Sequence, residues 1–251
     1  MRIKILGNGG ALNNGLPYNA FAIGRTLLCE APPDIMPSIQ RQGLDLAAID
    51  TIYISHLHGD HTFGLPFLIL SAFSIAAGGG RKPAFRIVGP RGLQEMTQRL
   101  VAAAFTESHP CYPWMQAHCT FEEIDETARP KLVKGLQTSI FKLDHMVETF
   151  GFSLARGDRR VVFAYVADTI WCISLQSVLR QRPEVVLIDL NGVDDDPSPV
   201  HLSQKDLREK AIPITGVHTR YWGTHLKNEF SSSIEGLTCA TPGMEIPLSA
   251  G

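Results

Sequence analysis

Four side chains that can bind metal ions lie within six residues, directly after a predicted strand. The segment reads His56-Leu57-His58-Gly59-Asp60-His61 and follows the apolar residues 51–55. Imidazole and carboxylate groups are the ligands that borderline divalent cations prefer. Because side chains two residues apart share one face of an extended chain, His56 and His58 can address one ion, which leaves Asp60 and His61 for a second. The spacing predicts a site for two neighbouring metal ions.

Further ligands are expected at the ends of other strands, because four groups do not complete two coordination shells. Three polar residues each follow a predicted strand: His145 follows 138–143, Asp168 follows 160–166, and His218 follows 212–217. Side chains at the carboxyl ends of separate strands can converge on one edge of a sheet. The carboxylate of Asp168 could offer one oxygen to each ion, as bridging carboxylates do in paired-metal sites.

The elements that must position these residues are strands in clusters, interrupted by single helices. The residue patterns predict strands at 2–6, 21–30, 51–55, 84–88, 138–143, 150–155, 160–166, 185–190 and 212–217, with a strand pair within 237–248, and helices at 34–42, 64–77, 92–105, 173–181 and 203–210. The glycine- and asparagine-rich residues 7–15 must form a loop. Residues 106–136 fit no element and either cover the core or line a pocket. The order favours two packed sheets with helices outside, in a single domain spanning 1–251.

Composition narrows the class of protein. The chain has 251 residues, a net charge of -2 and 44% hydrophobic residues, which excludes disorder and gives no basic excess for general attachment to nucleic acid. Five scattered cysteines without a Cys-x-x-Cys pair suit a reducing compartment. No export signal follows Met1, and the apolar run 64–77 is too short to span a bilayer and contains Pro66. We therefore expect a cytoplasmic protein without a membrane partner.

In order along the chain, these motifs resemble those of the metallo-β-lactamase superfamily, and specifically of its RNase Z-like branch. Residues 6–10 (Leu-Gly-Asn-Gly-Gly) are similar to the first strand and glycine turn of that branch, and 56–61 to its H-x-H-x-D-H signature. His145, with Gly151-Phe152 shortly after it, resembles the third motif, and Ala167-Asp168-Thr169 resembles the fourth. The resemblance covers almost the whole chain.

The resemblance implies an α/β fold, a four-layer αβ/βα sandwich, with two Zn²⁺ ions at one edge; Mn²⁺ or Fe ions could serve in their place. Carried over residue by residue, one set of ligands is His56, His58 and His145, the other is Asp60, His61 and His218, and Asp168 lies between the ions. A hydroxide that bridges the ions would be the nucleophile, since two cations lower the pKa of bound water towards neutrality. Asp60 is thereby expected to serve catalysis as well as binding.

The sequence departs from the family pattern in two places. The segment His218-Thr219-Arg220-Tyr221 is contracted after the last ligand, which leaves His225 as an alternative; we favour His218 because it ends a predicted strand. Only 23 positions separate His145 from Asp168. The tRNA-processing members insert a tRNA-clamping arm in that interval, so transfer RNA is a disfavoured substrate.

His201 is a candidate catalytic residue. It lies in Val200-His201-Leu202-Ser203, before a helix that Ser203 and Asp206 could cap. In related phosphodiesterases a histidine in a similar position contacts the phosphate and can protonate the leaving oxygen. A histidine packed at a helix entrance is the alternative. Asp189, which ends the predicted strand 185–190, could orient a ligand histidine or be a plain strand-end residue.

The leading interpretation is a dinuclear metal-dependent phosphodiesterase that acts on a small or medium substrate molecule. The same site could instead hydrolyse a thioester, a lactone or an aryl sulfate, because the pocket decides the bond. A non-hydrolytic binding or biosynthetic protein would use the same ligands. A homodimer is compatible with the sequence.

Overall fold

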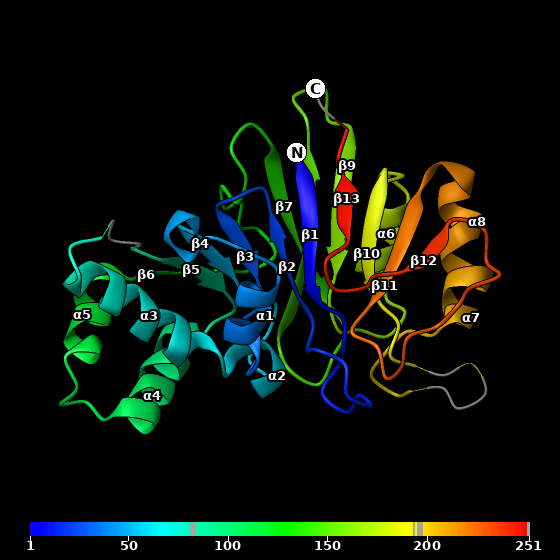
Figure 1. Cartoon of the computed structure of the whole chain (residues 1–251). Helices are drawn as coiled ribbons and strands as arrows, with labels where there is room; N and C mark the ends of the chain where they lie inside the picture. Colours follow the sequence, from blue (N-terminus) through cyan, green and yellow to red (C-terminus); the bar gives the residue numbers. More distant parts are fainter. Residues whose placement is uncertain (81–83, 193, 195–197, 250–251) are drawn as a thin grey trace.

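The computed structural model describes residues 1–80, 84–192, 194 and 198–249, and its strands form two sheets that pack face to face (Figure 1). The first sheet has the strand order β13-β1-β2-β3-β4-β5-β6 and the second has the order β12-β11-β10-β9-β8-β7. The strands are β1 (Arg2–Gly7), β2 (Ala20–Ile23), β3 (Leu27–Cys29), β4 (Thr51–Tyr53), β5 (Arg86–Gly89), β6 (Thr120–Glu123), β7 (Gln137–Leu143), β8 (Thr149–Ala155), β9 (Val161–Val166), β10 (Val185–Asp189), β11 (Arg220–Thr224), β12 (Leu237–Cys239) and β13 (Glu245–Pro247).

Helices cover the outer face of each sheet, so the molecule has four layers (Figure 1). One group of helices lies beside the first sheet: α1 (Ile35–Arg41), α3 (Leu65–Ala77), α4 (Leu93–Phe105) and α5 (Cys111–His118). The other lies beside the second sheet: α6 (Ile173–Leu179), α7 (Gln204–Asp206) and α8 (Ile212–Thr215). Short turns complete the set: α2 (Gly59–Thr62), η1 (Leu46–Ala48), the π-helical η2 (Leu207–Ala211) and η3 (Gly216–His218). The expected αβ/βα sandwich is confirmed.

Alternation along the strands divides the apolar residues between two cores. In β4, Tyr53 packs between the sheets, whereas its neighbours Ile52 and Ile54 pack under the helices of the first sheet. This follows from the period of two, which turns successive side chains to opposite faces of a strand. The central strand β10 is buried along its whole length because it has parallel neighbours on both sides and cover on both faces. Such rigid, buried strands hold the residues at their ends in place.

The last third of the chain departs from the prediction. The expected strand 212–217 is helical, because Leu207, Ala211 and Thr215 recur at helical spacing on one buried face. The helix begins at the predicted cap, where Ser203 and Asp206 form a reciprocal capping box. The predicted strand pair within 237–248 is also wrong as a pair, since β12 joins β11 in the second sheet and β13 joins β1 in the first.

Two further segments show how the first sheet is covered. Within 106–136, helix α5 buries Cys111 and Met115, so this part of the segment covers the core. The helical stretch Gly59–Ala77 is long and apolar enough to cross a membrane by length and composition, but 44% of its most apolar 18 residues are buried inside the molecule. Its second helix, α3, packs Leu65 and Leu68 into the core, as the prediction of a buried helix requires.

Candidate metal centre

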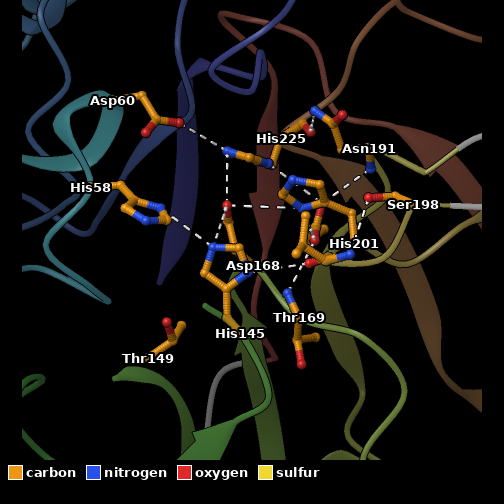
Figure 2. Close-up of polar contacts among 12 residues, drawn as sticks. His58, Asp60, His145, Thr149, Asp168, Thr169, Asn191, Ser198, His201 and His225 are labelled. Atoms are coloured by element: carbon orange, nitrogen blue, oxygen red, sulfur yellow. Dashed lines mark hydrogen bonds and ion pairs between the residues drawn. The ribbon is translucent and has the colours of Figure 1, made fainter. Parts of the chain in front are cut away.

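The signature residues lie in the loop that joins β4 to α3 and enter the short helix α2. His56 and His61 are fully buried, and the hydroxyl of Thr62 donates a hydrogen bond of 2.9 Å to the carbonyl of His58, which tightens the turn. His58 and Asp60 are partly exposed, and Figure 2 shows Asp60 on the side of the cluster where it faces His225. One loop therefore carries four candidate ligand side chains, His56, His58, Asp60 and His61.

Three histidines form the first group of converging side chains. Nε2 of His56 lies 3.0 Å from Nδ1 of His58, and that atom lies 3.4 Å from Nε2 of His145. His145 comes from the turn after β7, in the other sheet, at the position that the sequence predicted. The ligand atoms of all three lie within 4.8 Å of one another, which is close enough for one ion.

A second group consists of Asp60, His61 and His225. Nε2 of His225 lies 3.2 Å from Oδ2 of Asp60 and 3.4 Å from Nε2 of His61. Oδ2 of Asp60 also lies 3.4 Å from Nε2 of His61. These three atoms form a compact triangle beside the first group.

Asp168 lies between the two groups (Figure 2). Its Oδ2 atom is 3.9 Å from Nε2 of both His56 and His145 and 3.3 Å from Nε2 of His225, while Oδ1 is 3.6 Å from Nε2 of His61. Asp168 is nearly buried at the carboxyl end of β9. Its two carboxylate oxygens therefore face side chains of both groups.

The donor set fits divalent cations such as Zn²⁺. In the first group, Nδ1 of His58 lies within 3.4 Å of a ring nitrogen of both His56 and His145. A ring nitrogen carries at most one proton, so Nδ1 of His58 can donate a hydrogen bond to only one of these neighbours. A cation bound by all three nitrogens would account for their close approach. Between the two groups, Oδ1 of Asp168 is buried without a hydrogen-bond partner among the described residues. Buried polar atoms are rarely left unpaired unless a ligand or water completes them.

Charged neighbours set the protonation of the second group. Burial alone would lower the pKa of His61, but Glu30 and Asp168 outweigh it and hold that pKa well above its usual value. Burial likewise opposes protonation of His225, but Asp168 and Asp189 raise its pKa to about 10. Without a metal ion these imidazoles hold protons, which a cation would have to displace.

The first group has the opposite electrostatic character. Burial lowers the pKa of His56 well below its usual value, and the neighbouring rings of His61 and His58 lower it further. A neutral imidazole with a free lone pair is the form that binds a metal ion. The carboxyl of Asp60 stays ionised, because His61 and His225 outweigh the effect of burial and lower its pKa.

Two buried carboxylates, Asp189 and Glu30, contact histidines of the cluster on the side away from its centre. Asp189, at the end of β10, has Oδ1 3.5 Å from Nδ1 of His225 and Oδ2 2.9 Å from Nδ1 of His201, so it orients two rings. Glu30, directly after β3, has Oε2 3.2 Å from Nδ1 of His61. In both ligand rings, Nε2 then faces the cluster. The sequence patterns do not predict Glu30 as a site residue. They show only that a carboxylate ends the predicted strand 21–30.

The structure contradicts the prediction that His218 is a ligand and brings His225 to the site in its place. His218 is exposed in η3, before the amino end of β11, whereas His225 follows the carboxyl end of that strand. Since β11 runs parallel to β10, its carboxyl end lies beside Asp189. His225 does follow the end of a strand, as the pattern predicts for a site residue, but this strand begins eight residues later than predicted.

His201 borders the cluster from the loop before α7. Its ring lies 5.7 Å from that of His145 and 5.2 Å from that of His225, and its side chain is 16% exposed. Its contact with Asp189 fixes the ring, and its partial exposure makes the ring accessible from solvent.

The glycine-rich loop 7–15 approaches the site through Gly10. A Cβ atom at this position would lie 2.3 Å from the side-chain nitrogen of Asn191 and 2.9 Å from the ring of His225. Asn191 donates a hydrogen bond of 2.7 Å to the carbonyl of His225. Only glycine allows the loop to pack this closely against the backbone that carries His225.

Comparison of the sequence with protein families identifies one that spans most of the chain. The family described as anti-Pycsar protein Apyc1 matches residues 1–238. A curated relative is ribonuclease Z of Staphylococcus carnosus, which is 32% identical over 163 residues, covering 61% of this chain and 49% of that protein. The chain thus spans about half the length of this relative.

Solved structures share the architecture. Human tRNase Z, short form, superimposes with a TM-score of 0.75 at 20% identity over 100% of both chains. The metallo-β-lactamase fold protein YhfI from Bacillus subtilis gives a TM-score of 0.78 at 15% identity, covering 98% of each chain. The fold is therefore the metallo-β-lactamase fold. The ribonuclease Z and tRNase Z relatives lend no support to the expectation that transfer RNA is a disfavoured substrate.

Proposed function

Because the chain belongs to the anti-Pycsar protein Apyc1 family, within the RNase Z-like branch of the metallo-β-lactamase superfamily, we propose that it is a metal-dependent hydrolase of phosphodiester bonds. The observation that carries this proposal is the double cluster centred on Asp168, whose ligand atoms approach two separate groups of side chains. The similarity to ribonuclease Z supports the bond type.

We further propose that the site holds two metal ions and that the substrate is a small or medium molecule. His56, His58 and His145 would hold one ion, and Asp60, His61 and His225 the other, with Asp168 between them. Bound cations of this kind lower the pKa of a coordinated water and neutralise charge that develops on the phosphoryl oxygens. We propose Zn²⁺ for both positions.

The remaining side chains would position the groups and move protons. Asp189 holds Nδ1 of His201 at 2.9 Å, which leaves Nε2 of the same ring able to protonate a leaving oxygen. The same carboxylate and Glu30 hold the rings of His225 and His61 with Nε2 toward the cluster. A single domain over 1–251 and a cytoplasmic location complete the proposal.

The test combines elemental analysis with hydrolysis of bis-nitrophenyl phosphate. Purified protein should carry close to two equivalents of metal and hydrolyse this generic phosphodiester. Asp168→Ala should abolish hydrolysis and lower metal content, whereas the control Asp144→Ala should affect neither, because Asp144 is exposed and outside the cluster. Protein that binds no added zinc would refute the proposal. Hydrolysis of thioesters, lactones or aryl sulfates, but not of phosphodiesters, would show that the enzyme hydrolyses one of those bonds and not a phosphodiester.

A further inference from the structure

A chain of buried polar side chains connects the two sheets directly behind the metal centre. The hydroxyl of Thr224 donates to Oδ1 of Asn19 at 2.7 Å, and the amide of Asn19 donates to the hydroxyl of Tyr165 at 3.0 Å. That hydroxyl donates to Oε1 of Glu30 at 2.9 Å, and Oε2 of Glu30 lies 3.2 Å from Nδ1 of His61. The chain thus ends on a side chain of the candidate site.

The members of this chain alternate between the sheets. Glu30 follows β3 and Asn19 precedes β2, both in the first sheet, whereas Tyr165 lies in β9 and Thr224 in β11, both in the second. Each hydrogen bond therefore crosses the interface between the sheets. One end contacts His61, from the first sheet's half of the cluster, and the other adjoins His225, from the second sheet's half.

These side chains are buried, so each lost hydrogen bond would leave a polar group unpaired away from solvent. Glu30 and Tyr165 are 0% exposed, and Asn19 and Thr224 are at most 2% exposed. A buried carboxylate is unfavourable unless its oxygens are satisfied. Oε2 of Glu30 accepts from the backbone N–H of Ser55 at 3.3 Å and contacts His61, while Oε1 accepts from Tyr165. The burial is compensated only while both sheets contribute their partners.

The backbone is strained at or beside both ends of this row of hydrogen-bonded side chains. Glu30 has a φ of 66° and His225 has a φ of 56°, in the left-handed region that side chains other than glycine rarely adopt. Such conformations persist where the surrounding contacts over-determine them, and they are common at functional sites. Each strained residue directly follows a strand, β3 or β11, and directs its side chain to the site or its support.

We propose that Glu30 and Tyr165 are positioning residues that tie the two halves of the metal centre together. The polar chain sets how closely the sheets approach at this edge, and so sets the 3.4 Å separation between Nε2 of His61 and Nε2 of His225. The inference rests on the proposed metal site and adds to it a dependence of metal affinity on residues that do not contact the metal.

The test is Tyr165→Phe, with Tyr53→Phe as the matched control. Both tyrosines are fully buried between the sheets, and both pack edge-to-face against Phe152. The Tyr53 hydroxyl instead donates to the carbonyl of Phe150 at 2.9 Å, outside the polar chain. Loss of that hydroxyl reproduces the loss of a buried hydrogen bond without touching Glu30.

Two measurements separate positioning from general stability: zinc affinity by competition with a chelator, and the visible spectrum of the cobalt-substituted protein. Tyr165→Phe should weaken zinc affinity about 10- to 100-fold and shift the cobalt spectrum, as loss of support behind ligands does. Tyr53→Phe should leave both unchanged. Thr224→Val, which removes the far end of the chain with little change of volume, should act in the same direction as Tyr165→Phe.

The results that overturn the inference are equally definite. If Tyr165→Phe and Thr224→Val fold and retain the wild-type zinc affinity and cobalt spectrum, the polar chain does not position the site. An equal loss of affinity in Tyr53→Phe would assign the effect to stability and also overturn it. Wild-type protein that binds no zinc would remove the proposed function itself, so the two failures are distinguishable.

Discussion

Oδ2 of Asp189 and Nδ1 of His201 lie 2.9 Å apart, and this contact fixes the ring at the border of the metal centre. Asp189 is fully buried at the end of β10, so the ring is anchored to a strand that is buried along its whole length. Burial opposes ionisation of Asp189, but His201 and His225 outweigh it and hold its pKa at about 2. His201 is thus paired with a permanent carboxylate, the arrangement that suits a proton donor.

We predict that His201→Ala lowers the rate of phosphodiester hydrolysis about 10²- to 10⁴-fold, the usual contribution of a general acid. Ligand atoms of Asp168, His201 and His225 also converge, but metal content should stay at the wild-type level, because the groups His56–His58–His145 and Asp60–His61–His225 keep all their members. Steady-state kinetics and elemental analysis measure the two quantities. His118→Ala, on α5 and outside the cluster, is the control. Full activity in His201→Ala would leave the ring with a packing role only.

Replacement of His225 should remove metal, and replacement of His218 should not. His225→Ala takes one of three atoms from the second group, whereas His218 is exposed beyond the other end of β11. Elemental analysis after gel filtration should find that His225→Ala has lost at least one equivalent and His218→Ala none. Circular dichroism verifies that both variants are folded. The reverse pattern would identify His218, and not His225, as the metal ligand.

Gly10→Ala should impair the site without altering any ligand. The added Cβ would meet the Asn191 side chain at 2.3 Å, which forces the loop or the His225 backbone to move. We expect zinc affinity to fall at least tenfold, comparable to the loss of a residue that orients a ligand. Gly157→Ala is the control, because a Cβ there meets nothing within 4 Å. Equal zinc affinities in the two variants would show that the close approach is dispensable.

The capping box at Ser203 and Asp206 should make stability depend on pH. Partial burial opposes ionisation of Asp206, but Lys210, at 2.6 Å, and Ser203 outweigh it and lower its pKa. A folded-state pKa below the unfolded value means that the carboxylate stabilises the fold above about pH 4 and that this stabilisation is lost as the pH falls through the folded-state value.

Asp206→Asn should therefore lower the free energy of unfolding at pH 7 by about 0.5 to 1 kcal/mol, discounted for its solvent exposure. The difference from the wild type should shrink below about pH 4. Urea unfolding of chelator-treated protein measures both values. Glu107→Gln, at an exposed position away from the capping box, should show no such difference. A constant difference at all pH values would assign the loss to geometry and not to charge.

Much of this protein could be predicted from short-range patterns. The six consecutive residues His56 to His61 predict a metal site by their types and spacing alone. The strands β4, β9 and β10 are likewise predicted from local runs of apolar residues. The cap formed by Ser203 and Asp206 is equally local. Such features need only neighbouring residues, so a single sequence is enough to predict them.

The choice between His218 and His225 depended on where β11 begins, and that depended on packing. Residues 212–217 are apolar enough for a strand, but their helical contacts with the core prevail, as tertiary packing often does over local preference. The polar chain from Thr224 through Asn19 and Tyr165 to Glu30 joins residues up to 205 positions apart. No spacing along the chain encodes such a contact, because it exists only once the two sheets have packed against each other.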